Sequence, residues 1–552
     1  MPGLIDRRIG LLFLVFVAAL GVATLRATWL GAVRAPALKR AAATQQVQTI
    51  AMPAPRGTIT DRNGAVLAVS EPASDVSATP YLVRRPLAVA AKLAPLLGLD
   101  ASDVLSKLSE QSGFVYLARR LPATRADQIA KLRIDGITLT PSSRRTYPRN
   151  WLAAQVLGSA GDQPRTGTGF EYGSDRILRG QDGIRRVVSD ALGQPISIDD
   201  ERPTIPGKDV QLTLDANLQD KVESVLDGVG QVFRPRSATA IVMDPQTSQI
   251  LALANWPRVN ANDPGGAPPS AQQDLAVGYT YEPGSTFKAI TVAGALADHV
   301  VAPETPIFVP YELRVADRTL HDAEAHGSET LTVADVLKQS SNIGAVQIAL
   351  MMRAHRFAQW VDRFGFGRPT GVALPGEEQG IVPTYARYSG SSIANLPIGQ
   401  GQAVTPMQMM EAYAAIANGG ILRTPQIVRS VDGRAVREAP GRRVISPAAA
   451  ASVRDMLRGV LAAGGTASEA SIAGYDLAGK TGTAQKVDPD GQYSRTRYVA
   501  SFMGFAPASN PRLLVAVVVD EPQGAIYGGQ VAAPAFQKIV AFALPYLGIR
   551  PS

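Results

Sequence analysis

The chain has 552 residues, of which 45% are hydrophobic and 18% charged, and its formal net charge is +8. At about 150 residues per domain, this length predicts three or four folding units, and the hydrophobic content excludes a disordered chain. The absence of cysteine excludes disulfides, thiolate nucleophiles and cysteine-ligated metal sites. The basic residues occur as scattered pairs with no interleaved aromatic residues, which argues against binding to nucleic acid.

The four histidines are few for a metal site or for a Ser-His-Asp triad, and none of them forms an H-x-x-x-H pair. Two of them, His321 and His326, lie in one short polar stretch. We interpret both as solvated loop residues, with a role in lining a site or in binding a metal as the alternatives. The composition therefore argues against a histidine-rich metal site.

An uncharged, mostly apolar run covers residues 9–25 and continues, after Arg26, to residue 33. Seventeen helical residues rise about 26 Å, close to the lower limit for crossing a membrane, and Arg26 can extend the span by reaching the interface. Arg7 and Arg8 favour a cytoplasmic N-terminus. The pattern predicts a cytoplasmic tail at 1–8 and a single transmembrane anchor at 9–33, with the rest of the chain outside the cytoplasmic membrane. A cleaved signal peptide is the alternative, although no polar segment precedes a clean cleavage site.

Residues 34–204 form the first predicted domain after the anchor. An alanine-rich stretch at 35–48 predicts a helical stalk, which Pro53 and Pro55 end. Residues 56–69 predict a strand, an Asn-Gly turn and a returning strand. Leucine and alanine spacing predicts helix over 86–137, and residues 138–200 are polar and rich in turn residues.

A shift in composition at 203–207 predicts the start of a second domain, which covers 205–552. Asp215 is placed to cap a helix that runs to about residue 226. Two strands around a turn at 244–248 follow, then a proline-rich loop at 257–270. Residues 534–547 predict the last helix.

Three short motifs occur once each and in this order: Ser285-Thr-Phe-Lys288, Ser340-Ser-Asn342 and Lys480-Thr-Gly-Thr483. An S-x-x-K motif arises by chance about once in such a chain, and K-T-G in roughly one chain in twenty. The combination is a specific signal, because all three motifs occur in order and in suitable local settings.

Ser285 follows Gly284 and opens an apolar helical pattern. At positions i and i+3, Ser285 and Lys288 project from one face of that helix. The positive end of the helix dipole stabilises a developing oxyanion, and with burial it lowers the pKa of Lys288, so that a neutral amine can act as base without histidine. Taken alone, the pair also fits a capping serine followed by an exposed lysine.

Ser340 and Asn342 follow an expected helix at 332–338. A hydroxyl and a carboxamide two residues apart can relay a proton and hold a substrate amide. Taken alone, they also fit an ordinary turn at the end of a helix.

Lys480 begins an expected strand, with neighbouring strands at 498–505 and 513–519. Gly482 lets a substrate backbone approach the strand edge, Lys480 supplies positive charge, and Thr481 and Thr483 can bind a carboxylate. The alternative is an exposed lysine on an edge strand.

At these motifs the chain resembles the penicillin-recognising serine acyltransferases, in which S-x-x-K carries the nucleophile and K-T-G is a companion motif. The stretches 281–288, 399–402 and 479–485 are similar to the transpeptidase branch. The stretches 56–64 and 169–171 resemble the N-terminal domain of class B penicillin-binding proteins.

The resemblance implies a multidomain α+β and α/β protein. Its parts are one transmembrane helix, an elongated pedestal or dimerisation-like domain, and a C-terminal penicillin-binding domain with an antiparallel sheet flanked by helices. It also implies a D,D-transpeptidase in which Ser285 attacks a D-Ala-D-Ala carbonyl and an acceptor amine resolves the acyl-enzyme. In that scheme Lys288 is the base, Ser340 and Asn342 relay protons and orient the amide, and Lys480, Thr481, Gly482 and Thr483 hold the donor. The backbone N–H groups of Ser285 and Thr483 form the oxyanion hole, and the cycle implied by the resemblance needs no metal or cofactor.

The partners implied by the resemblance are peptidoglycan stem peptides, β-lactams, a SEDS-family glycosyltransferase and other division proteins. A β-lactamase and a membrane-anchored β-lactam sensor share the acylation motifs and stay open as alternatives. Residues 35–200 lack an E-D-x-x-F motif, which excludes a bifunctional class A enzyme. The uninterrupted 285–480 core, without a long N-terminal insertion, favours a division role over an elongation role.

Overall fold

The computed structural model describes residues 3–32, 47–161, 163, 166–189, 195–438 and 440–551. Most of the stalk expected at 35–48 falls on residues 33–46, outside the described residues. The chain forms two compact units. The N-terminal unit comprises Met1–Pro55, Glu71–Arg144 and Arg179–Gly207, and the C-terminal unit comprises Arg56–Ser70, Arg145–Leu178 and Lys208–Ser552. Two early segments of the chain therefore pack with its C-terminal half.

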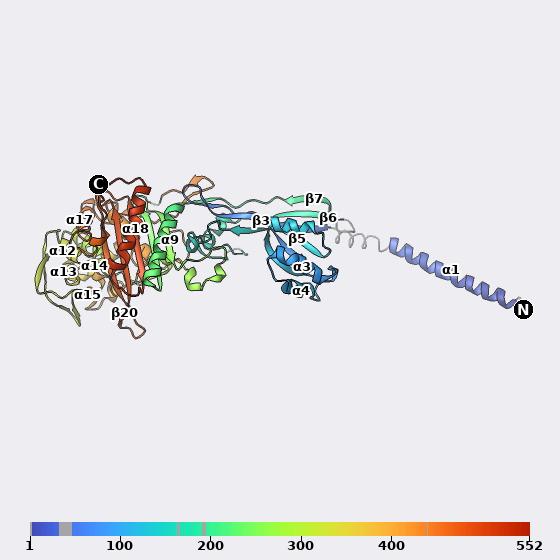
Figure 1. Cartoon of the computed structure of the whole chain (residues 1–552), viewed down its shortest axis with the longest axis horizontal. Helices are drawn as coiled ribbons and strands as arrows, with labels where there is room; N and C mark the ends of the chain where they lie inside the picture. Colours follow the sequence, from blue (N-terminus) through green and yellow to red (C-terminus); the bar gives the residue numbers. More distant parts are fainter. Residues whose placement is uncertain are drawn as a thin grey trace. The chain divides into compact units, whose positions relative to one another are not determined.

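The first helix, α1 (Gly3–Ala32), lies at the N-terminal end of the chain (Figure 1), and its residues 9–25 carry no charge. Its stretch Ile9–Ala32 has 24 residues, and its side chains are not covered by protein. Twenty-four helical residues rise about 36 Å, enough to cross a hydrocarbon core of about 30 Å. The expectation of one N-terminal apolar helix of membrane-spanning length is confirmed.

The N-terminal unit contains two sheets. One has the order β1-β6-β7, with bounds Val47–Met52, Gly183–Ser189 and Pro195–Arg202. In the other, β3 (Val66–Ala78) pairs with β4 (Val115–Pro122) and β5 (Ile137–Thr146). The helices of this unit are α3 (Pro86–Leu97), α4 (Ala101–Leu108) and α5 (Ala123–Lys131).

The prediction of helix over 86–137 is wrong in the middle of that range, where Val115–Pro122 form the strand β4. Val115, Leu117 and Leu121 are buried there, in an alternating pattern that packs against the helices α3 and α4. Period-two burial specifies a strand, and this short signal is hidden within the leucine and alanine spacing of its surroundings. The turn-rich interpretation of 138–200 likewise missed three strands.

The C-terminal unit is built on a five-stranded antiparallel sheet with the order β10-β9-β21-β20-β19. The bounds are β9 (Ser237–Asp244), β10 (Gln249–Trp256), β19 (Ala478–Val487), β20 (Tyr493–Ala506) and β21 (Leu513–Asp520). Every residue of β21 is buried, so both faces of this central strand are covered. The strands expected around the 244–248 turn and beside Lys480 are confirmed.

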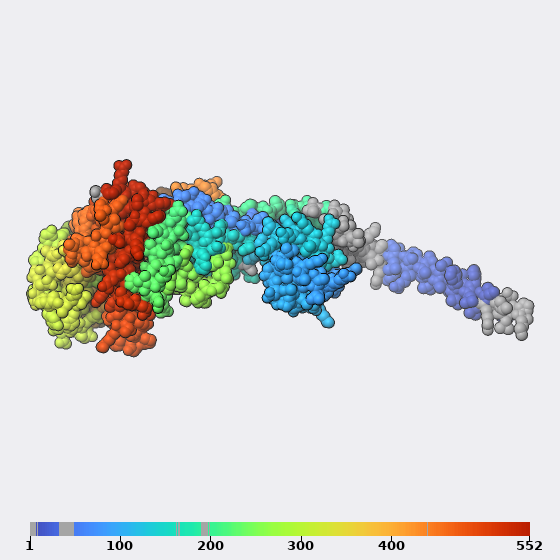
Figure 2. Space-filling view, viewed as in Figure 1, coloured from blue at the N-terminus to red at the C-terminus, as the bar shows by residue number. Residues whose placement is uncertain are grey.

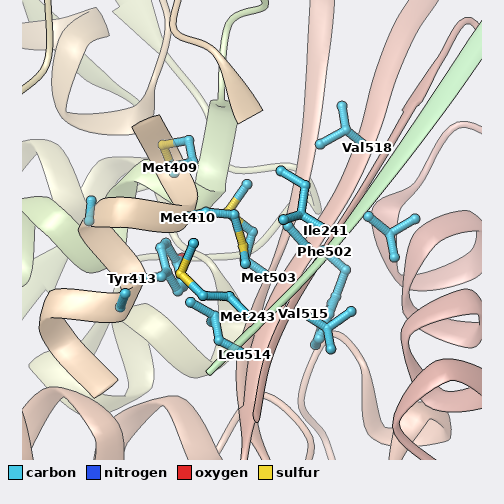
Figure 3. Close-up of a cluster of buried hydrophobic side chains, with 14 of the residues drawn as sticks. Ile241, Met243, Met409, Met410, Tyr413, Phe502, Met503, Leu514, Val515 and Val518 are labelled. Atoms are coloured by element: carbon cyan, nitrogen blue, oxygen red, sulfur yellow. The ribbon is translucent and has the colours of Figure 1, made fainter. Parts of the chain in front are cut away.

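Helices cover both faces of this sheet. On one face α9 (Ala216–Phe233) and α18 (Gly528–Tyr546) lie side by side, although they are far apart in the sequence (Figures 1 and 2). On the other face α16 (Pro406–Ala417) directs Met409, Met410 and Tyr413 toward the strands (Figure 3). Asp215 caps α9 by accepting the N–H groups of residues 217 and 218, as expected.

A second helical group follows the β9–β10 hairpin in the sequence. It contains α11 (Lys288–Ala297), α12 (Val333–Gln339), α13 (Asn342–Met352), α14 (Ala354–Arg363) and α17 (Pro447–Arg458). Helix α11 contacts the other four, and α17 also contacts β19. The group therefore carries the first two motifs to the edge strand that bears the third.

A small sheet of the same unit joins β17 (Arg434–Ala435), β16 (Val428–Val431), β8 (Val210–Leu212), β2 (Ile59–Thr60) and the start of β3. The hairpin expected at 56–69 is present as β2 and β3. The remaining short elements are α6 (Ala154–Leu157), α7 (Gly169–Gly173), α8 (Asp175–Leu178), α10 (Leu275–Gly278), α15 (Ser392–Asn395), β11 (Pro306–Val309), β12 (Leu313–Val315), β13 (Arg318–Leu320), β14 (Glu329–Thr332), β15 (Ile421–Leu422) and β18 (Arg442–Arg443).

A buried ionic cluster joins two sequence stretches that lie more than a hundred residues apart. The Glu171 carboxylate is fully buried and accepts hydrogen bonds from Arg56 and, at 2.6 Å, from Arg145. Arg56 also donates to Asp175 at 2.6 Å, and its side chain is 11% exposed. Because each charge in this apolar setting depends on its partner, the loss of one member leaves a buried charge uncompensated.

Glu171→Gln keeps the shape of the side chain and removes its charge. We expect the free energy of unfolding of the C-terminal unit to fall by about 3–5 kcal/mol, because the buried Arg145 and Arg56 guanidinium groups both lose the charge of Glu171, although Arg56 still contacts Asp175. Urea denaturation of the detergent-solubilised full chain, followed by tryptophan fluorescence, measures this. Glu438→Gln at an exposed position is the control and should change the midpoint little. Equal midpoints for the two variants would contradict the structural role of the cluster.

Candidate active site

Ser285 lies in a 3-10 turn (Gly284–Phe287) that leads directly into α11. Its two following neighbours are anchored in the core: Thr286 Oγ1 donates to Pro283 O at 2.7 Å, and Phe287 is fully buried. Ser285 itself is only half-buried. The turn therefore presents the Ser285 hydroxyl at the positive end of a helix and away from the packed interior.

Lys288 begins α11 and is completely buried. Its Nζ donates to the Ser340 backbone carbonyl, to Asn342 Oδ1 at 2.7 Å and to Ser340 Oγ at 3.3 Å. These contacts bring the first motif to the second. Among the described residues, no hydrogen bond joins the Ser285 hydroxyl to another side chain.

Ser340 lies at the junction of two helices. It ends α12 with a left-handed backbone (φ 64°), and Ser341 caps α13 by accepting the Gly344 N–H at 2.9 Å. Because the backbone reverses sharply here, Ser340 belongs to neither helix, and its side chain lies at the surface of the helical group.

Lys480 lies on the sheet and contacts the Ser340 side chain. It is fully buried on β19, and its Nζ donates to Ser340 Oγ at 2.8 Å. The Ser340 hydroxyl therefore accepts hydrogen bonds from Lys288 and Lys480, which lie on opposite sides of it in the sequence. The structure thus brings residues of all three motifs within hydrogen-bonding distance.

Burial changes the charge of both lysines. It lowers the pKa of Lys288 to about 7, against the opposing effect of the Asp322 carboxylate. It also lowers the pKa of Lys480 well below its ordinary value, and the neighbouring charge of Lys288 adds to that decrease. Near neutral pH, a neutral amine at Lys288 is therefore accessible.

The rest of the third motif lies close to the turn of Ser285. A Cβ on Gly482 would lie 2.3 Å from Ser501 Oγ and 3.0 Å from Pro283 O, so only glycine permits this approach. A Cβ on Gly284 would likewise lie 3.2 Å from the Thr483 carbonyl oxygen. The backbone of Thr483 is therefore a neighbour of the Ser285 turn, as a shared oxyanion site requires.

The two threonines of the third motif have separate contacts. Thr481 Oγ1 shares a hydrogen bond of 2.8 Å with Thr466 Oγ1. Thr483 Oγ1 accepts the Gly528 N–H at 3.1 Å. Both hydroxyls can change partner when a ligand carboxylate approaches the strand.

Asp322 is a site residue that the sequence did not reveal. Its carboxylate accepts hydrogen bonds from Ser341 Oγ at 2.6 Å, from the Asn342 N–H and, at 2.9 Å, from the Ile343 N–H. It thereby fixes the start of α13, which carries Asn342. In the sequence it is one of two acidic residues in a polar stretch, and no spacing rule connects it to a motif that begins eighteen residues later.

The two histidines beside Asp322 differ. His321 is exposed, as expected, although its carbonyl oxygen accepts the Asn342 Nδ2–H at 3.0 Å. The His326 side chain is 20% exposed, and its Nε2 lies 3.3 Å from Asp322 Oδ2. Within the part of the chain that the structure describes, no group of three His, Asp or Glu side chains could hold a metal ion.

Two family models match the chain. The penicillin-binding protein transpeptidase domain matches residues 238–541, and the penicillin-binding protein dimerisation domain matches residues 51–212. Among curated proteins, the peptidoglycan D,D-transpeptidase FtsI of Escherichia coli is 35% identical over 516 residues, which are 92% of this chain and 85% of that protein. The stage V sporulation protein D of Bacillus subtilis is 34% identical over 90% of this chain and 79% of its own length.

Comparison with solved structures shows the same similarity. Penicillin-binding protein 3 of Mycobacterium tuberculosis in complex with aztreonam has a TM-score of 0.71 at 28% identity, covering 91% of this chain and 98% of that one. A peptidoglycan synthetase from Bifidobacterium adolescentis has a TM-score of 0.73 at 27% identity, covering 92% and 98%. With its apolar first helix, its antiparallel sheet between helices and both family domains in this order, the chain belongs to the class B penicillin-binding proteins.

Proposed function

We propose that the chain is a peptidoglycan D,D-transpeptidase that acts through an acyl-enzyme on Ser285. The observation that carries the proposal is the convergence on Ser340: its hydroxyl accepts from Lys288 and Lys480, and Lys288 lies one turn from Ser285. A hydroxyl, a low-pKa amine and a second cation in this arrangement supply a nucleophile, a base and a carboxylate partner.

Acylation uses the lone pair of neutral Lys288. The three hydrogen bonds donated by Lys288 need its ammonium form. When Lys288 is neutral, its two N–H groups can stay on the Ser340 carbonyl and Asn342 Oδ1, so the donation to Ser340 Oγ is lost and a lone pair becomes available. The amine accepts the Ser285 proton while Oγ bonds to the carbonyl carbon of the penultimate D-alanine. The backbone N–H groups of Ser285 and Thr483 stabilise the oxyanion that forms.

Breakdown of this intermediate cleaves the C–N bond and releases D-alanine. The proton from Lys288 reaches the leaving nitrogen through the Ser340 hydroxyl, which lies between the two lysines. An amine of an acceptor stem peptide then attacks the ester carbonyl, gives up its proton along the same path and restores the Ser285 hydroxyl. Lys480, Thr481 and Thr483 bind the donor carboxylate, whose charge favours the ammonium form of Lys480.

The alternatives make different use of the same residues. A β-lactamase needs a water activated for deacylation, whereas a sensor needs acylation alone. The match to relatives over both domains, one of them named a D,D-transpeptidase, supports the transpeptidase.

We further propose that α1 anchors the chain as a single pass, with both units outside the cytoplasm, and that the anchor contacts a SEDS-family glycosyltransferase during division. The support is the apolar helix, the basic pair at Arg7 and Arg8, and the family resemblance. Co-purification with and without residues 1–50 tests the contact, and equal recovery without the anchor would exclude it. A tagged chain should localise at the septum, and lateral localisation would indicate elongation instead.

The proposed nucleophile is tested by the mass of the intact chain after treatment with benzylpenicillin. We expect one covalent adduct that maps to Ser285, because the opened β-lactam remains as an ester. Ser285→Ala should abolish the adduct and the release of D-alanine from donor peptides, while Ser328→Ala at an exposed position should keep both. An adduct elsewhere would exclude Ser285. Loss of the adduct within seconds would indicate a β-lactamase, and an adduct without activity on any donor would indicate a sensor.

Acylation should also depend on pH. Since burial lowers the pKa of Lys288 to about 7 and the base must be neutral, the acylation rate should rise about tenfold per pH unit below pH 7 and level off above it. Stopped-flow acylation by a chromogenic β-lactam from pH 5.5 to 9.5 measures the midpoint. A midpoint above pH 9 would indicate an ordinary lysine and contradict the assignment.

Asp322→Asn refines this test. The Asp322 charge raises the pKa of Lys288, so its removal should move the midpoint to lower pH, while the asparagine oxygen can still accept the N–H groups of α13. The matched control is Asp317→Asn, an exposed position that should leave the midpoint in place.

A further inference from the structure

The His326 imidazole lies in the polar loop that joins β13 to β14, just before the second motif. Its side chain is only 20% exposed. Its Nδ1 lies 2.6 Å from the Gly327 carbonyl oxygen, and its Nε2 lies 3.3 Å from Asp322 Oδ2. Each ring nitrogen of His326 therefore faces an oxygen that accepts hydrogen bonds.

These two contacts determine which protonation state of the ring fits the structure. A carbonyl oxygen only accepts, so Nδ1 must carry a proton in its contact with Gly327. In a neutral imidazole Nε2 would then hold a lone pair, which would face the Asp322 carboxylate. Nε2 is buried and has no hydrogen-bond partner among the described residues. A proton on Nε2 turns this unfavourable contact into an ion pair, so the geometry favours the imidazolium form.

The charges that face the ring also suit a cation. Glu329 Oε1 lies 3.5 Å from Nδ1, so the carboxylates of Asp322 and Glu329 both face the imidazole. Among the ion pairs of the described residues, no lysine or arginine is paired with either carboxylate. The imidazolium of His326 is therefore the cation that directly contacts Asp322.

The ring also connects the two helices of the second motif. Asp322 holds the start of α13 by accepting the Ile343 N–H at 2.9 Å. Glu329 begins β14, and Thr332 at the end of that strand caps α12, the helix that ends at Ser340. His326 thus lies between the carboxylate that fixes one helix and the strand that leads into the other.

Asp322 links this ring to the proposed base. Burial lowers the pKa of Lys288, and the Asp322 charge opposes that decrease. A cation beside Oδ2 offsets part of the Asp322 charge, so the ion pair acts on Lys288 more weakly than a lone carboxylate would. The presence of the imidazolium therefore favours the neutral form of Lys288.

We propose that His326 is a positioning residue for acylation that acts through Asp322: its imidazolium is the counter-ion of that carboxylate and favours the neutral amine of Lys288 below pH 7. The proposal rests on the proposed function, in which Lys288 is the base. An imidazole is ordinarily protonated at pH 6, so the counter-ion is present in the range where a lysine loses its proton least readily. His326 itself contacts neither the substrate nor the reacting atoms.

The pH dependence of acylation in the full-length protein tests this role with two uncharged replacements. His326→Gln keeps an amide donor for Asp322, and His326→Asn keeps one for Gly327. With stopped-flow acylation by a chromogenic β-lactam, we expect both variants to move the midpoint up by about half a pH unit and to slow the reaction at pH 6 about threefold. The rates above pH 9 should be unchanged, because the imidazole of the unmodified protein is then neutral.

A second comparison tests whether the effect passes through Asp322. In the Asp322→Asn background, His326→Gln should leave the midpoint where Asp322→Asn alone places it, because the imidazolium then has no carboxylate to offset. A shift of the same size in both backgrounds would overturn the proposal. The matched control is His355→Gln at an exposed position of α14, which should keep the profile of the unmodified protein.

Benzylpenicillin adducts on each variant show whether it is folded and able to acylate. Absence of the adduct from the unmodified protein would defeat the proposed function, whereas a normal adduct with the same midpoint in His326→Gln and His326→Asn would overturn only the role of His326. Rates that fall equally at pH 6 and pH 9 would overturn it as well, because the ring would then serve only to hold the loop.

Discussion

The hydroxyl of Ser340 and the two lysines that donate to it form the contact on which the site depends. Lys288 comes from a helix and Lys480 from the edge of the sheet, and both are fully buried. Two ammonium groups so close together and so poorly hydrated cannot both keep a full charge, so at least one becomes a neutral amine near pH 7. The fold thus makes a neutral amine accessible at a residue that is ordinarily protonated.

The surrounding structure serves to hold these groups in place. The helical group carries Ser285 and Ser340, the sheet carries Lys480, and the glycine at position 482 lets the two layers approach within van der Waals contact. Asp322 sets the start of α13 and also raises the pKa of Lys288, so one carboxylate affects both the geometry and the charge of the site. Precise placement of this kind is what the proposed reaction depends on.

Much of this arrangement could be predicted from the sequence, because the motifs have local causes. The break before Ser285, the helix after it and the strand at Lys480 were each predicted from neighbouring residues, and the structure has all three. The strand β4 could not be predicted, because its alternation is short and it lies directly between two helices, α4 and α5. The role of Asp322 depends on contacts between segments that are distant in the sequence, which no spacing rule encodes.

The interleaving of the two compact units has a consequence for dissection of the chain. Strand β8 pairs in parallel with β2, which lies about 150 residues earlier, and Arg56 and Glu171 also belong to the C-terminal unit. A fragment that started near residue 205 would keep every motif residue yet expose the bare backbone edge of β8, a template for unwanted strand addition between copies. Excising the catalytic half at its chain boundary would therefore favour aggregation, whereas a cut that removes only α1 preserves every strand pairing described above.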